Sequence, residues 1–132
     1  MHEVIRIDDY VATRFVVLKD VSSGVLERCF DDSVLVSSQN FEFMVVNQEY
    51  DCKIYLFGDA VEDKTEKSVL CKIADRNVVV GRRPMVEVEM ENRRYYIPKN
   101  TIVEYLDRDS FYFEYTRKDL IQVDDVIHPD ML

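Results

Sequence analysis

The sequence predicts an all-β protein, either a small barrel or a sandwich built mostly from antiparallel hairpins, with little helix. Three observations support this class. Apolar and polar residues alternate over many short segments, and these segments are rich in β-branched and aromatic residues. Turn-forming residues separate the segments. No segment carries an apolar stripe at i, i+3, i+4 and i+7 over three turns, which a core helix requires.

The clearest element is a hairpin that joins residues 85–91 to residues 94–98. With Asn92 and Arg93 as a two-residue loop, the cross-strand pairs include Glu91 with Arg94. The same pairing sets Met90 opposite Tyr95, Glu89 opposite Tyr96, and Val88 opposite Ile97. It gathers the apolar residues on one face, because a slip of one residue would turn all of them outward. This apolar face comprises Val86, Val88, Met90, Tyr95 and Ile97.

Three further hairpins are predicted from pairs of strand-like segments separated by polar or glycine-containing turns. They join residues 13–19 to 25–30, 50–57 to 68–73, and 101–106 to 111–115. In the first of these, Gly24 supplies the turn conformation. In the second, the connecting loop of residues 58–67 is long.

The remaining segments give two more strands and two open assignments. Residues 41–46 and 77–80 are expected to be strands. Residues 32–39 and 118–127 stay open: each fits a short helical turn, and residues 120–123 fit a strand equally well. The strand order around residues 43–57 resembles that of an OB-fold or a related small barrel. This resemblance is one of architecture, since no family motif accompanies it, and it implies no residue roles.

The length and composition favour a single β-rich domain over residues 1–132, located in the cytoplasm. A chain of 132 residues is long enough to bury a substantial core. No apolar run approaches the ~20 residues of a membrane span, and the first residues lack the layout of a signal peptide. The three cysteines, Cys29, Cys52 and Cys71, stand in apolar surroundings and are expected to be buried, reduced thiols.

The net charge of -9 is distributed unevenly along the chain. Residues 1–66 contain 6 Lys/Arg and 14 Asp/Glu, whereas residues 67–132 contain 11 and 12. A strongly acidic first half repels nucleic acid and anionic membranes, and it attracts a basic protein surface.

The sequence contains no recognisable catalytic or metal-binding motif. His2 and His128 stand at opposite ends, no C-x-x-C pair occurs, and the nucleophile motif G-x-S-x-G is missing. Adjacent carboxylates in a strand point to opposite faces and cannot converge on one substrate. We therefore expect no cofactor, no metal and no enzymatic activity.

One local feature stands out against the acidic background. Residues 67–99 contain eight basic and four acidic residues, and aromatic residues lie beside the arginines. Cations next to stacking aromatics are typical of proteins that bind single-stranded nucleic acid. The candidate patch comprises Arg82, Arg83, Arg93, Arg94 and Tyr96.

Three functions are compatible with the sequence. The leading hypothesis is a non-enzymatic protein-interaction module, of the adaptor or inhibitor type, whose acidic surface meets a protein with a basic surface. The first alternative is single-stranded nucleic-acid binding through the patch in residues 76–99. The second is a small-ligand carrier or an enzyme with its site in the barrel mouth.

Overall fold

The computed structural model describes all of residues 1–132 and consists mainly of strands, which confirms the predicted all-β class with little helix. The strands are β1 (His2–Asp9), β2 (Arg14–Asp20), β3 (Leu26–Asp31), β4 (Glu49–Tyr50), β5 (Cys52–Val61), β6 (Val69–Val80), β7 (Arg83–Met90), β8 (Arg93–Pro98), β9 (Ser110–Val123) and β10 (Val126–Ile127). The helices are α1 (Ser33–Val36) and the 3-10 helices η1 (Lys99–Tyr105) and η2 (Pro129–Met131). None of them has the length and apolar character needed to cross a bilayer.

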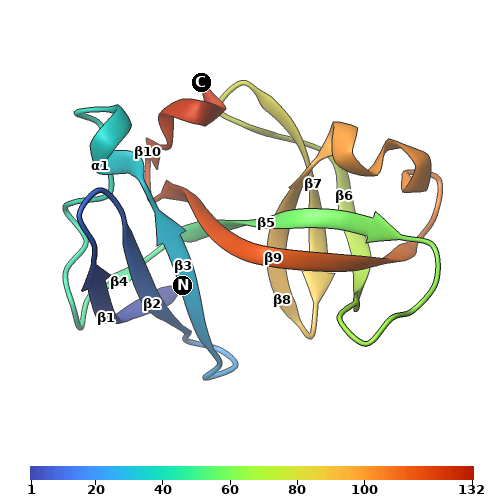
Figure 1. The fold of residues 1–132 in the computed structure, drawn as a ribbon, viewed down its shortest axis with the longest axis horizontal. Helices are drawn as coiled ribbons and strands as arrows, with labels where there is room; N and C mark the ends of the chain where they lie inside the picture. Colours follow the sequence, from blue (N-terminus) through green and yellow to red (C-terminus); the bar gives the residue numbers. More distant parts are fainter.

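Five strands are joined by their pairings into a ring with the order β9, β5, β8, β7, β6 and back to β9. All of these pairings are antiparallel except β5 with β8, which are parallel and meet at one residue pair, Tyr55 with Tyr96. Figure 1 shows β5 and β9 as two long strands that extend beyond the ring. We call this part of the molecule the ring.

The first three strands form an antiparallel meander, which short β4 extends beside β1. We call these four strands the N-terminal sheet. It joins the ring through β3, which runs parallel to β9 and meets it at Phe30 and Asp119. Beyond this pair β3 and β9 diverge, as Figure 1 shows, so side chains hold the two parts together.

Two of the predicted hairpins are confirmed, one of them with a corrected register. β2 and β3 pair as expected, and Gly24 has a φ of 75° in their turn. β7 and β8 also pair, but their loop is Glu91-Asn92, so Glu89 faces Arg94 rather than Glu91. Both loop residues have positive φ, as a type I′ turn requires. Relative to the prediction, the loop begins one residue earlier and each residue of β8 faces a residue two positions earlier in β7. A shift of two positions keeps every side chain on its predicted face, and the predicted apolar face is buried.

Three other expectations are wrong. β5 does not pair with β6, because its long connection leaves β5 free to pair with β9 along ten residue positions. Residues 101–106 do not form a strand, because residues 101–105 belong to η1. Residues 41–46 contain turns and no strand, although two of their apolar residues, Phe41 and Met44, are buried. Residues 77–80 do belong to a strand, the end of β6, and residues 33–36 form a short helix.

The core extends through both parts of the molecule. A cluster of 20 buried residues includes Val16 and Leu18 of the N-terminal sheet and Val88 and Ile97 of the ring. The three cysteines are buried and unbonded, as expected. Burial raises the pKa of Cys52 and that of Cys71 to about 12, which keeps both thiols protonated and unreactive at neutral pH.

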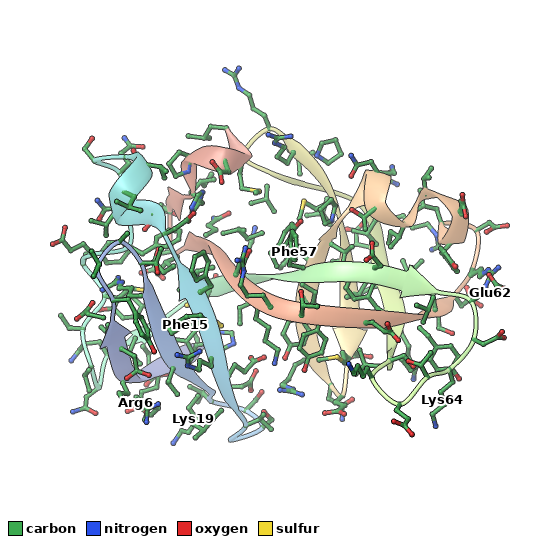
Figure 2. The ribbon with its side chains drawn as sticks, viewed as in Figure 1. Arg6, Phe15, Lys19, Phe57, Glu62 and Lys64 are labelled. Atoms are coloured by element: carbon green, nitrogen blue, oxygen red, sulfur yellow. The ribbon has the colours of Figure 1, made fainter.

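A stack of aromatic rings and guanidinium groups covers the outer side of the junction. The guanidinium of Arg117 lies 4.2 Å from the ring centre of Phe30 and 5.2 Å from that of Phe57. In the same way, Arg28 covers Phe15 at 3.6 Å. Figure 2 places Phe15 on the N-terminal sheet and Phe57 on β5, so the stack connects the two parts.

Candidate functional site

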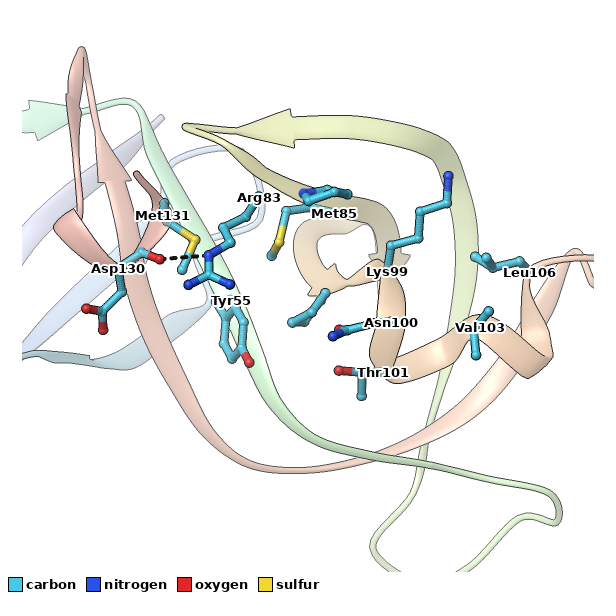
Figure 3. A pocket seen from close by; sticks show the side chains of 12 residues that line it. Tyr55, Arg83, Met85, Lys99, Asn100, Thr101, Val103, Leu106, Asp130 and Met131 are labelled. Carbon is cyan, nitrogen blue, oxygen red and sulfur yellow. Dashed lines mark hydrogen bonds between the residues drawn. The ribbon is translucent and has the colours of Figure 1, made fainter.

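The largest cavity is a cleft of about 720 Å³ beside the ring, between η1 and η2 (Figure 3). β5 supplies Tyr55, the start of β7 supplies Arg83 and Met85, and η1 supplies Lys99 and Val103. We call this cavity the ring cleft. Its volume lies within the range of about 300–1,000 Å³ that is usual for small-ligand sites.

The cations of the ring cleft have no carboxylate partner. Arg83 Nε donates a hydrogen bond to the backbone oxygen of Asp130 at 3.0 Å, and Lys99 Nζ donates to the amide oxygen of Asn77 at 2.8 Å. Eight of the ten arginines of the chain are in ion pairs within 4.0 Å of a carboxylate oxygen. Arg83 and its neighbour Arg82 are the two exceptions.

A second candidate site is a groove of about 330 Å³ at the free end of the N-terminal sheet. We call it the N-terminal groove and define it by Asp9 at the end of β1, Tyr10 and Val11 of the β1–β2 turn, Leu35 of α1, and Glu42. The three apolar side chains are exposed, Tyr10 by 58%, Val11 by 108% and Leu35 by 60%. Neither carboxylate has a basic group within 4.0 Å, whereas nearby Asp31 is held by Arg14 at 2.7 Å.

The sequence-predicted patch does not form one surface. Arg93 is buried and lies 2.9 Å from Glu91 and 3.6 Å from Glu27. Arg94 points to the opposite face and pairs with Glu87 at 3.1 Å. The hydroxyl of Tyr96, a residue 8% exposed, also donates to Glu87, and the cation over its ring is Lys53 at 5.6 Å rather than an arginine of the patch. Arg82 and Arg83 stay exposed at the β6–β7 turn, and nucleic-acid binding stays a prediction.

The junction between the N-terminal sheet and the ring contains a buried carboxylate, that of Glu27. This residue is 2% exposed, and its oxygens accept hydrogen bonds from Tyr95 and from Lys118, the latter at 3.0 Å. Arg93 and His2 lie 3.6 Å and 3.5 Å away. Burial alone would raise the pKa of Glu27, but the contacts with His2, Tyr95 and Lys118 outweigh it and lower the pKa to about 2.

This lowered pKa predicts an acid-labile junction. The pKa of Glu27 falls from 4.5 in the unfolded chain to about 2 in the folded one. Ionised Glu27 therefore contributes its full stability above pH 4.5, and this contribution of about 3 kcal/mol is lost as the pH falls towards 2. Urea unfolding at several pH values measures the free energy of unfolding of the wild type and of Glu27→Gln. The difference between the two should shrink as the pH falls from neutral to about 2.5. A constant difference would contradict the assignment.

Two groups of one histidine and two carboxylates have the composition of a metal site. In the first group, His128 Nδ1 accepts a hydrogen bond from the Asp130 backbone N–H at 3.1 Å, so Nε2 bears the proton and donates to Asp32 at 2.6 Å. Both ring nitrogens are then occupied, and the histidine fastens the C-terminal segment to the end of β3.

The neighbouring carboxylate of Asp119 has its pKa raised by burial, and its contact with Arg117 opposes this rise.

The second group consists of His2, Asp20 and Glu27. The ammonium group of Lys118 already occupies one oxygen of Glu27, and Arg93 lies close to the same oxygen. Two cations at this carboxylate oppose the binding of a third. This group is therefore part of the junction described above.

Most residues of both cavities carry no signal in the sequence that would mark them as site residues. Leu35 and Glu42 of the N-terminal groove lie in segments with an open or a strand prediction, and Val103 of the ring cleft lies in η1, where the sequence predicts a strand. The one feature of the sequence that could have indicated the cavities is the presence of apolar residues in segments whose pattern fits neither a strand nor a helix. Arg83 is the one residue of the predicted patch that lines a cavity of ligand size.

We compared the chain with models of protein families, with curated proteins and with solved structures, and none of them matches it.

Proposed function

We propose that the protein is a non-enzymatic protein-interaction module that binds its partner in the N-terminal groove. The observation that carries this proposal is the combination of exposed apolar side chains with unpaired carboxylates in one groove. Tyr10, Val11 and Leu35 provide the apolar surface, and Asp9 and Glu42 provide the charge.

The apolar side chains argue for a protein partner. Leu35 stands between Val34 and Val36 in α1, and these two neighbours are 47% and 51% exposed. A short helix with three consecutive exposed apolar side chains gains stability only when another surface covers it, by about 25 cal/mol for each Å² removed from water. Exposed apolar residues rimmed by polar ones are typical of protein–protein contacts.

The carboxylates argue for a partner with a basic residue. The groove lies entirely within residues 1–66, which contain 14 acidic and 6 basic residues. Asp9 and Glu42 have no internal cation to lose on binding, so a lysine or arginine of the partner gains an ion pair without breaking one. The charge of this half of the chain also speeds the encounter with a basic surface.

Contact through side chains fits the strands better than addition of a partner strand. The outer side of β1 pairs with β4 only at His2 and Glu3. Beyond them the pairing of β1 with β2 shifts between Val4 and Arg6, and the strand ends in Asp8 and Asp9. Irregular pairing and charged residues are the features that oppose edge-to-edge pairing.

Three sequence-based expectations belong to this proposal. We place the module in the cytoplasm, we assign it no catalytic step, and we keep an OB-like relationship of the strands as a hypothesis about architecture. None of the three is needed for the binding experiment that follows.

The experiment selects peptides from a displayed random library on the immobilised protein. We expect the enriched peptides to combine lysine or arginine with apolar residues, and their affinity to fall as salt rises. The double substitution Asp9→Asn with Glu42→Gln should weaken the selected peptides about tenfold or more, equivalent to the loss of about 1.4 kcal/mol. Leu35→Ser should weaken them by a similar factor.

Matched control variants separate the groove from general charge and apolar effects. Glu49→Gln with Glu104→Gln removes the same two charges at exposed positions outside the groove, and Val79→Ser removes an apolar side chain that is 62% exposed elsewhere. Both controls should keep the wild-type affinity. Selected peptides without basic residues, or equal binding to the groove and control variants, would refute the proposal.

A further inference from the structure

We propose that the ring cleft is a binding site for a small organic anion, one that joins an apolar body to a single carboxylate, sulfonate or phosphate group. This site is separate from the N-terminal groove and shares no residue with it. The proposal therefore stands or falls independently of the protein-interaction function.

The walls of the ring cleft suit an apolar body. Six of its lining residues are apolar and come from three separate parts of the chain: Pro84, Met85, Pro98, Val103, Leu106 and Met131. Two of them are methionines, whose flexible thioether side chains adapt to ligands of different shape. The cleft exceeds the next cavity, of about 460 Å³, by more than half.

The position of Met131, which forms one wall, is fixed by the backbone. The oxygen of Met131 accepts the Arg82 N–H at 2.6 Å, and the Met131 N–H donates to the His128 oxygen at 2.9 Å. Gly81 has a φ of 61°, and a Cβ atom there would lie 2.3 Å from the Met131 oxygen. The C-terminal segment thus packs against a position that only glycine fits, and the cleft exists before any ligand binds.

The charge of the cleft selects an anion. The hydrogen bond from Arg83 Nε to Asp130 holds the guanidinium at the cleft and leaves both Nη groups without a protein acceptor. Lys99 also lines the cleft, but its ammonium group donates to the neutral Asn77 and is directed away from Arg83 in Figure 3, so Arg83 is the cation that an anion would meet. Asp130 is the one acidic lining residue, and its carboxylate lies 3.8 Å from His128 Nδ1. Figure 3 shows this carboxylate directed away from the Arg83 guanidinium.

An anion in this position meets a guanidinium with free paired donors, an arrangement that holds carboxylate and phosphate oxygens by two parallel hydrogen bonds. The apolar body of the same molecule then covers Met85 and Met131. In a chain with a net charge of -9, an arginine at a cleft without an ion-pair partner is a local exception that an anionic ligand would satisfy.

The test uses 8-anilinonaphthalene-1-sulfonate, a fluorescent probe with an aromatic body and one anionic group. We expect the native protein to bind one molecule with enhanced fluorescence, and 1-naphthoate to displace it at least tenfold better than the neutral 1-naphthalenemethanol. Arg83→Glu should weaken probe binding about tenfold or more, and Val103→Glu should do the same. Each variant must keep the cooperative urea transition of the wild type, so that the fluorescence reports the folded protein.

Two control variants carry the same chemical changes outside the cleft. Arg82→Glu reverses the neighbouring exposed charge, and Val79→Glu alters a valine as exposed as Val103, each 62%. Both should bind the probe within about threefold of the wild type. Equal losses for Arg82→Glu and Arg83→Glu would reduce the effect to net charge and overturn the proposal. Equal displacement by the neutral compound, or unchanged binding to Val103→Glu, would also overturn it.

Discussion

Replacing Glu27 by glutamine is expected to lower the free energy of unfolding by roughly 3 to 5 kcal/mol. Glutamine keeps the size of the side chain, so no cavity forms, but the negative charge disappears from a position that is 2% exposed. Lys118, whose side chain is 13% exposed, would then have lost its carboxylate partner, whereas Arg93 would keep its ion pair with Glu91. An uncompensated buried charge costs far more than a broken surface ion pair.

Urea unfolding at neutral pH measures this loss, and Glu89→Gln is the matched control. Glu89 also pairs with an arginine, Arg94, but both side chains are about one-third exposed or more. Its replacement should cost at most about 1 kcal/mol. Adding Lys118→Met to Glu27→Gln should restore part of the stability, because the double variant removes both charges. Equal small effects of Glu27→Gln and Glu89→Gln would contradict the assigned role of the junction.

Glu27 also shows where prediction from the sequence ends. The strand at residues 25–30 is evident from alternation and from Gly24, and the expected burial of Cys29 marks one face as inward, yet nothing local shows that carboxylates on that face are buried. In the structure Glu27 and Asp31 are buried beside Cys29, while Leu26 on the other face is 57% exposed. The cations that make this possible stand 66 and 91 residues away along the chain. Pairings at such separations leave no local pattern.

The same limit explains which strand pairings follow from the sequence. Local turn chemistry predicts the short-turn hairpins β2 with β3 and β7 with β8, which are confirmed, but it does not predict β1 with β2 or β6 with β7. The connection from β5 to β6 is long and imposes no pairing, so β5 joins β9 instead. Phe41 and Met44 are three residues apart, and both reach the core from turns rather than from one face of a strand.

The candidate sites, too, depend on contacts that the sequence does not show. The charge count identifies a basic segment at residues 67–99, but not which of its arginines pair with carboxylates. Register decides this, because it sets Arg94 opposite Glu89 and turns Arg93 inward towards Glu27. Arg82 and Arg83 escape such pairing because they stand at a turn, beyond the carboxylates of β7.

The second large effect is expected for Gly58→Ala, which should destabilise the protein by roughly 3 kcal/mol or more. Gly58 stands in β5 where the pairing with β9 shifts by one residue, from Phe57 opposite Arg117 to Gly58 opposite Tyr115. A Cβ atom at Gly58 would lie 2.0 Å from the backbone oxygen of Glu114 and 2.7 Å from the Cα atom of Tyr115. Backbone atoms cannot turn aside as a side chain can, so β5 and β9 would have to separate.

Gly24→Ala is the control that distinguishes this clash from the general cost of replacing glycine. Gly24 has a positive φ, but a Cβ atom there would meet no other atom within 4 Å. Alanine at this position should therefore cost only about 1 kcal/mol, the strain of a left-handed conformation. Urea unfolding of the two variants should differ by roughly 2 kcal/mol or more. If they are equally stable, β5 and β9 adapt to the added methyl group. The close approach of these two strands of the ring would then contribute no specificity to the fold.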